Sequence, residues 1–137
     1  MIEIEALKLS EQELFDKAAM HLITQKSVAV CKVKGRTKCT YENKRTKKRC
    51  AVGGILTDSE IKQLRLAPAE GSMAFDLGWG VLIHHEVVPD NHKELLKNLQ
   101  ILHDRYSNAG PKTVIDFKPG LELLANQFKL EWKYADV

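Results

Sequence analysis

Three stretches of the chain place apolar residues at intervals of three and four, which is the spacing of one face of an α-helix. The first begins at Ser10, where Ser10 and Glu13 form an S-x-x-E capping box that satisfies two backbone amides at a helix start. The second runs from Asn91 to Gly110-Pro111, and the third begins near Pro119, a residue suited to a first helical turn. The side chains predicted to be buried are Leu14, Phe15, Ala18, Ala19, Leu22 and Ile23 in the first helix, Leu95, Leu96, Leu99, Leu102 and Tyr106 in the second, and Leu121, Leu124, Ala125 and Phe128 in the third.

Two further segments complete the helical part of the chain. Thr57 and Glu60 form a second capping box, which predicts a short helix through residue 64. Residues 73–83 alternate apolar and other residues with a period of two, but Gly78 and Gly80 weaken both a strand and a helix, so this stretch stays open between the two. Trp132 and the nearby tyrosine are expected to pack the end of the last helix onto the body.

The periodicity changes at Cys31, where apolar and small residues begin to alternate with cations. The even positions carry Lys32, Lys34, Arg36 and Lys38, which predicts a half-buried strand, or two short strands broken at Gly35, with a cationic outer face. Residues 42–47 are polar and indicate a turn, and residues 48–52 are predicted as the return strand of a basic hairpin over about 28–52. With 44% hydrophobic and 28% charged residues, the 137-residue chain is expected to form one globular domain, residues 1–137. The predicted fold class is α+β, with three to four helices packed on a small antiparallel β-hairpin or sheet.

The charge of the chain is concentrated in one place. Residues 32–49, here called the basic segment, hold nine of the 21 basic residues and one of the 18 acidic residues, so they carry +8 while the remainder carries −5. Such a patch attracts an acidic protein surface, a nucleic acid or the acidic part of a second copy of the chain, although lysines on a strand edge also serve solubility alone. The candidate binding residues are Lys34, Arg36, Lys38, Tyr41, Lys44, Arg45, Lys47, Lys48 and Arg49.

The sequence contains three cysteines, Cys31, Cys39 and Cys50, which indicate the cellular compartment of the protein and whether it could bind zinc. Their C-x7-C-x10-C spacing lacks the tight pair typical of structural zinc sites, so we interpret them as small buried hydrophobes, with zinc binding as an open alternative. The odd number of cysteines and the acidic N-terminus, which is unlike a signal peptide, favour a reducing cytoplasm. This is the cytoplasm of the host cell if a phage encodes the chain. Because no apolar run reaches about 18 residues, we expect no membrane partner.

The sequence gives less support to an enzymatic function. Cys50 follows three cations, which would activate an exposed thiol, and His103 is a conceivable base, but we expect the adjacent Asp104 to point about 100° away and not to orient that imidazole. His84 and His85, together with His92, form a second polar cluster that could hold a metal or perform acid–base chemistry. We therefore assign no catalytic residue, metal ligand or cofactor.

Several strings in the sequence resemble a family of small bacteriophage and prophage proteins. That family reads approximately C-x-Y, then C-A-V-G-x-L-I-x-D, then L-Q-x-x-H-D, and the matching residues here are Cys39 to Tyr41, Arg49 to Asp58 (RCAVGGILTD) and Leu99 to Asp104 (LQILHD). The resemblance implies a phage or mobile-element setting and no particular reaction. It implies an accessory protein that binds and modulates a host macromolecule, with an anti-defence role as one form of this, here through the basic hairpin. The alternatives are a non-specific nucleic-acid-binding protein using the same hairpin and, second, a zinc- or thiol-dependent enzyme.

Overall fold

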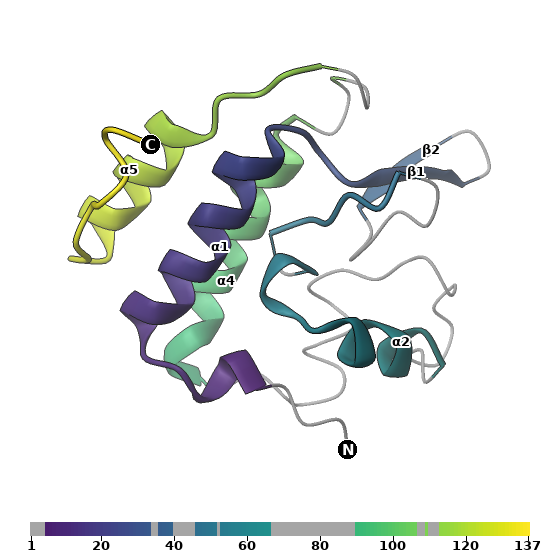
Figure 1. The fold of residues 1–137 in the computed structure, drawn as a ribbon, viewed down its shortest axis with the longest axis horizontal. Helices are drawn as coiled ribbons and strands as arrows, with labels where there is room; N and C mark the ends of the chain where they lie inside the picture. The colour runs from purple at the N-terminus through teal and green to yellow at the C-terminus, as the bar shows by residue number, and fades with distance from the viewer. Residues whose placement is uncertain are drawn as a thin grey trace.

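The fold is described from a computed structural model, which defines residues 5–33, 36–39, 46–51, 53–66, 90–106, 109 and 113–137. Its elements, in chain order, are the 3-10 helix η1 (Glu5–Lys8), α1 (Glu11–Gln25), β1 (Val30–Val33), β2 (Arg36–Cys39), the 3-10 helix η2 (Gly53–Ile55), α2 (Asp58–Leu66), α4 (Asp90–Asp104) and α5 (Lys118–Gln127). Figure 1 shows α1 and α4 side by side, with α5 on one flank and η2, α2 and the two strands on the other. None of the helices in these ranges is long and apolar enough to cross a bilayer.

Helix α1 is the central element of the core, and its sequence signals are confirmed. All six side chains predicted for its apolar face are buried. At its start the Ser10 hydroxyl accepts from the Glu13 amide at 3.2 Å, and the Glu13 carboxylate accepts from the Ser10 amide at 3.3 Å. The helix ends at Lys26, whose left-handed backbone (φ 56°) lets its amide donate to the Leu22 carbonyl at 2.9 Å. Local patterning therefore suffices for this element.

The second capping box, at the start of α2, is also confirmed. The Thr57 amide donates to Glu60 Oε1 at 2.8 Å, and the Glu60 amide donates to Thr57 Oγ1 at 3.1 Å. Glu60 Oε2 accepts from the amide of Glu5 at 2.9 Å, so the same carboxylate also ties η1 to α2. This double use explains why a glutamate is 5% exposed here.

Helices α4 and α5 pack closely on each other and on α1. Their predicted leucines are buried, but Tyr106, predicted to belong to the buried stripe of α4, is 36% exposed because the helix ends at Asp104 and not near residue 110. Gly120 permits the close approach of α5, since a Cβ there would lie 2.4 Å from Leu102 Cδ1. Phe128, predicted to face inward, is only partly buried.

The C-terminal segment returns to α1, as predicted. The Gln12 side chain pairs with the backbone of Glu131, accepting its N–H at 2.8 Å and donating to its carbonyl at 3.2 Å. Asp16 accepts hydrogen bonds from the Tyr134 hydroxyl at 2.7 Å and from Lys133 Nζ at 3.1 Å. Residues 131–134 are thus fastened along the outer side of α1.

The predicted α+β fold, with helices packed on a β-hairpin, is wrong. The apolar faces of α1, α4 and α5 pack on one another and on η2, so the core is formed by helices and no sheet lies beneath them in the part of the chain that the structure describes. β1 and β2 are four-residue strands that pair with each other, Val30 opposite Cys39 and Val33 opposite Arg36. They stand beside the helices in Figure 1.

The predicted return strand of the hairpin is also wrong. The return strand is predicted over 48–52, but the described residues there, Lys48 to Ala51, lead into η2 and form no strand, with Arg49 alone making a single β-bridge. The physical reason is a competing partner: the backbone of Arg49 is hydrogen-bonded by side chains of α1. The predicted turn residues 42–45, and residues 73–83, lie outside the described residues.

Candidate binding surface

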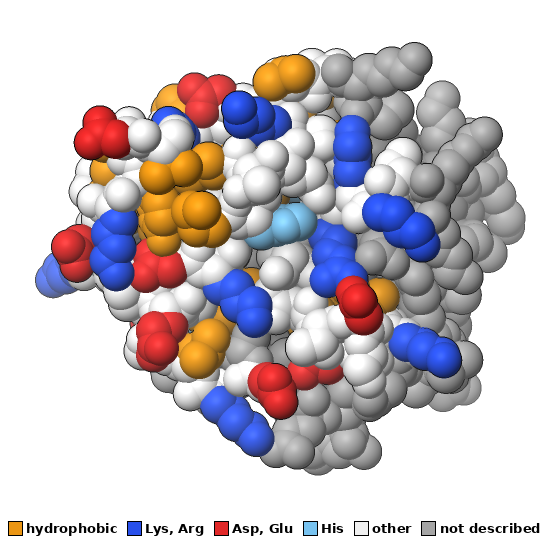
Figure 2. Space-filling model, viewed as in Figure 1, with side chains coloured by type: hydrophobic (Ala, Val, Ile, Leu, Met, Phe, Trp, Pro, Cys, Tyr) orange, Lys and Arg blue, Asp and Glu red, His pale blue; other side chains and the backbone are white. Residues whose placement is uncertain are grey.

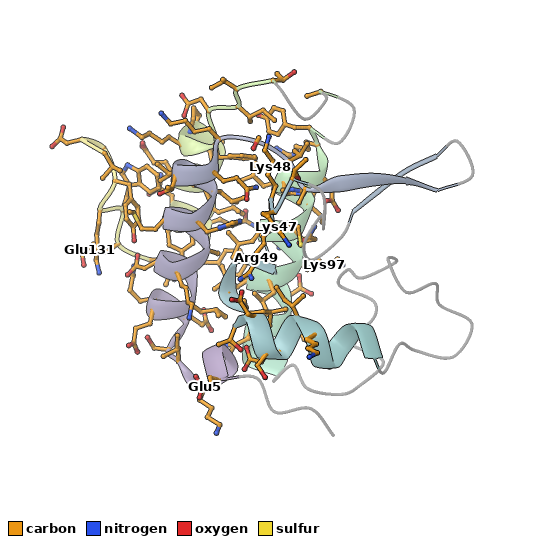
Figure 3. All side chains as sticks on the ribbon, turned by 45° about the vertical axis from the view of Figure 1, so that its right-hand side comes forward. Glu5, Lys47, Lys48, Arg49, Lys97 and Glu131 are labelled. Atoms are coloured by element: carbon orange, nitrogen blue, oxygen red, sulfur yellow. The ribbon has the colours of Figure 1, made fainter. Side chains whose placement is uncertain are left out.

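The nine candidate binding residues fall into three groups in the structure. The side chains of Lys47, Lys48 and Arg49 are described, and these three residues lie near one another in the middle of Figure 3. Arg36 and Lys38 are on β2, where the backbone alone is described. Lys34, Tyr41, Lys44 and Arg45 lie outside the described residues.

Arg49 fastens the end of the basic segment to helix α1. Its amide donates to Gln25 Oε1 at 2.8 Å, and its carbonyl accepts from Gln25 Nε2 at 2.7 Å and from His21 Nε2 at 2.8 Å. A primary amide offers one donor and one acceptor side by side, so Gln25 holds this backbone as a neighbouring strand would. The segment is therefore fixed to α1 from residues 24 and 28 positions earlier in the chain.

The guanidinium of Arg49 serves the same anchoring role. It donates to the Leu56 carbonyl at 3.1 Å and to the Asp58 carboxylate at the start of α2. The Arg49 side chain is 20% exposed, whereas that of Asp58 is 92% exposed. Arg49 was predicted as a surface contact, but the structure places its charge between two elements of the protein itself.

Lys47 and Lys48 come immediately before this anchor. Lys47 is exposed and has a left-handed backbone (φ 63°), while Lys48 is half-buried and its amide donates to Thr46 Oγ1 at 3.3 Å. Because consecutive Cα atoms are about 3.8 Å apart, both lysines are held within about 8 Å of the Arg49 Cα. The anchor therefore limits where the Cα atoms of these two lysines lie.

An open hollow of about 540 Å³ lies on the outer face of α1, next to the anchored segment. Its lining residues, Lys17, Met20, His21, Thr24 and Gln25, follow the helical spacing of the face that the core leaves uncovered. Met20 is 41% exposed there, which places an apolar thioether beside an exposed lysine.

His21 is a residue that sequence reasoning missed. Its ring lies against η2, where a Cβ on residue 54 would come within 2.3 Å of His21 Cδ2, so only glycine fits at Gly54 without a shift. Burial lowers the pKa of His21, and the nearby charges of His103 and Arg49 lower it further, against the opposing effect of its bond to the Arg49 carbonyl. A single histidine on the polar side of a helix carries no sequence signal of such a role.

The charges of this face are unevenly spread. Figure 2 shows Lys and Arg side chains around a surface histidine and toward the right of the view, whereas most acidic side chains lie toward its left and lower edges. In Figure 3, Glu131 lies at the left edge, whereas Lys47, Lys48 and Arg49 lie near the middle of the view. Basic side chains therefore surround this histidine, with acidic side chains also among them on the right.

The thiol hypothesis finds no support in the geometry. Cys50 is fully buried in the core, and its Sγ accepts from the Gly53 amide at 3.2 Å. The expectation that Asp104 would not orient His103 was wrong, because His103 Nδ1 and Asp104 Oδ1 are 2.9 Å apart. However, His103 Nε2 already accepts the Ala29 amide at 2.9 Å, and the ring is fully buried and stacked on Phe117. This pair acts as a structural link between α4 and the chain that follows α1.

The remaining metal candidates are only partly described. His92 is 3% exposed and its Nε2 donates to the Leu9 carbonyl at 2.8 Å, while its Nδ1 has no hydrogen-bond partner among the described residues. Within the described ranges no three His, Cys, Asp or Glu residues converge as a metal-binding group. The side chains of Cys31 and Cys39, and residues His84 and His85, lie outside those ranges.

The comparisons with known proteins add no assignment. Neither protein-family models, nor curated proteins, nor solved structures match the chain.

Proposed function

We propose that this chain is a small non-catalytic binding protein of a phage or mobile element, and that it engages an acidic surface of a host protein through the basic segment. The proposal is supported by the concentration of charge, +8 within residues 32–49 against −5 in the remainder. Opposite potentials on two partners speed association and fix their relative orientation.

The observation that carries the proposal is the anchor at Arg49. Its backbone is held by Gln25 and His21, and its guanidinium by Asp58, so the adjoining lysines are presented from a fixed stretch of backbone. Ordering a flexible chain on binding costs free energy, and a segment that is already fixed avoids part of this cost. A fixed backbone at this point reduces the conformational entropy lost when the adjoining lysines bind a partner.

The lining of the adjacent hollow favours a protein partner over a nucleic acid. Nucleic-acid binders combine cations with aromatic platforms for bases or with side chains that reach base edges. The described lining here instead offers the Met20 thioether and the Thr24 side chain beside Lys17. Exposed methionine is enriched in protein interfaces and adapts to side chains of varied shape.

A comparison of the binding of two fluorescent probes tests this function. The probes are a fluorescent polyglutamate peptide and a fluorescent random-sequence DNA duplex, and the readout is fluorescence anisotropy across a salt series from about 50 to 300 mM. We expect the acidic peptide to bind at least as tightly as the duplex. The double variant Lys47→Glu/Lys48→Glu should weaken peptide binding by about tenfold or more, since each reversal turns an attraction into a repulsion.

The matched control is Lys62→Glu/Lys129→Glu, which makes the same change in net charge at two exposed lysines on α2 and after α5. This variant should bind like the wild type. Equal binding by the Lys47/Lys48 variant would remove this surface as the contact. Tighter binding of the duplex than of the peptide would replace the proposal by the nucleic-acid alternative.

A further inference from the structure

We infer that the hollow on α1 receives one apolar side chain of the acidic partner, so that the protein recognises an acidic segment that contains an apolar anchor. This inference rests on the proposed function and names the chemistry of the partner more closely. It is carried by the juxtaposition of the hollow, its lining and the anchored cations beside it.

The hollow is bounded by structure that does not need a ligand to form. α1 contributes its lining over two turns, and the bonds from His21 and Gln25 to Arg49 fix the adjoining segment against the same turns. Gly54 lets η2 approach the His21 ring. A site that is formed before binding takes a side chain without an ordering cost on the protein side.

The polar atoms of Gln25 and the Nε2 of His21 already form hydrogen bonds within the protein. Gln25 uses both its Oε1 and its Nε2 on protein backbone, and His21 uses its Nε2 in the same way. Because its pKa is lowered, His21 is uncharged at neutral pH. What the lining adds for a ligand is therefore Met20, 41% exposed, with the Thr24 side chain beside it, which suits an apolar group.

The hollow has one lysine in its lining and two lysines in the segment next to it. Lys17 is an exposed lining residue, and Lys47 and Lys48 directly precede the residue that is bonded to His21 and Gln25. An apolar side chain entering the hollow would thus bring its chain neighbours toward positive charge. Charge complementarity selects acidic residues on both sides of the anchor, and not a basic or neutral segment.

The test compares two short fluorescent peptides of Glu and Asp, one with a single central Phe and one with Gly in its place, by anisotropy at low salt. The wild type should bind the Phe peptide roughly tenfold more tightly, because partial burial of the aromatic ring removes apolar surface from water. Thr24→Trp, which fills the hollow, and Met20→Ser, which removes its apolar contact, should both abolish this preference. Leu123→Trp, on an exposed site of α5, is the matched control and should keep the preference.

The possible outcomes distinguish the apolar-anchor inference from the proposed binding of an acidic partner. Equal binding of both peptides by the wild type overturns the apolar-anchor inference while the acidic-partner function stands. A preference for Phe that survives both hollow variants also overturns it, because the anchor then binds elsewhere. Failure of both peptides to bind, with the fold intact by circular dichroism, removes the proposed function itself.

Discussion

The side-chain amide of Gln25 brackets the backbone of Arg49, with Oε1 2.8 Å from the amide nitrogen and Nε2 2.7 Å from the carbonyl oxygen. Gln25 is the last residue of α1, and Arg49 is the last residue of the basic segment. The Gln25 side chain thus holds the Arg49 backbone from α1, in addition to the single β-bridge that Arg49 makes. This pair places the cationic segment relative to the helical core.

Replacing Gln25 by alanine should lower the free energy of unfolding by about 2 kcal/mol, because the Arg49 amide and carbonyl both lose a partner in a partly buried place. Urea denaturation followed by circular dichroism measures this. Gln127→Ala, at an exposed site at the end of α5, is the control and should change stability by less than about 0.5 kcal/mol. Similar free energies of unfolding for the two variants would show that the hydrogen bonds between Gln25 and the Arg49 backbone contribute little to stability.

Gly54→Ala should destabilise the protein by about 2 kcal/mol, since the new methyl group must displace the His21 ring. Gly120→Ala should cost less, because the atom in its way is the terminal methyl of a flexible leucine, Leu102. A double-mutant cycle gives the sharper check: in a His21→Ala background, Gly54→Ala should be nearly neutral, a coupling of at least about 1 kcal/mol. Additive effects would contradict the assigned contact.

Stability should fall on acidification through His21. Burial lowers its pKa below the ordinary value of 6.5, helped by the charges of His103 and Arg49. Between the lowered pKa and 6.5 the unfolded chain binds the proton and the folded protein does not, so the free energy of unfolding decreases as the pH drops through this window. Comparing wild type with His21→Gln from about pH 7.5 to 5 separates this effect from that of the other histidines. A pH dependence that is equally steep in the variant would exclude His21 as a cause.

Tyr134→Phe should destabilise the attachment of the C-terminal segment, because its hydroxyl donates to Asp16 at 2.7 Å. We expect a loss of about 1–2 kcal/mol, as is typical of a hydrogen bond to a charged group. Hydrogen exchange over residues 131–137 should also accelerate. Burial and the Asp16 carboxylate raise the pKa of Tyr134 well above 10, so its absorbance should not titrate with that of an exposed tyrosine. Tyr106→Phe, at a site 36% exposed, is the control and should leave that segment protected.

The helical parts of the fold were predictable because their signals are local. Both capping boxes, Ser10 with Glu13 and Thr57 with Glu60, formed as their three-residue spacing indicated. The apolar stripes of α1, α4 and α5 also faced the core, apart from Tyr106 and the partly buried Phe128. Such signals depend on residues within one or two helical turns, which meet as soon as the helix forms.

The candidate site was less predictable, because its key contacts join distant segments. The sequence shows where the cations are, but an alternating pattern does not specify what a strand pairs with. Residues 48–51 form no strand, and the backbone of Arg49 is hydrogen-bonded by side chains of α1. His103 illustrates the same limit: side-chain torsions brought Asp104 back to its imidazole although the two residues are adjacent on a helix.

By itself the amino-acid sequence determined the helices, their buried faces and the gathering of +8 charges in 18 residues, because each of these depends on neighbours in the chain. Only the tertiary structure decided that Arg49 is an anchor, that His21 lines a hollow and that the helices pack on one another. Those outcomes depend on groups that are 24 or more positions apart and meet only after the core has packed. The chemistry of a residue depends on its own side chain, whereas the residues that it contacts depend on how the helices pack.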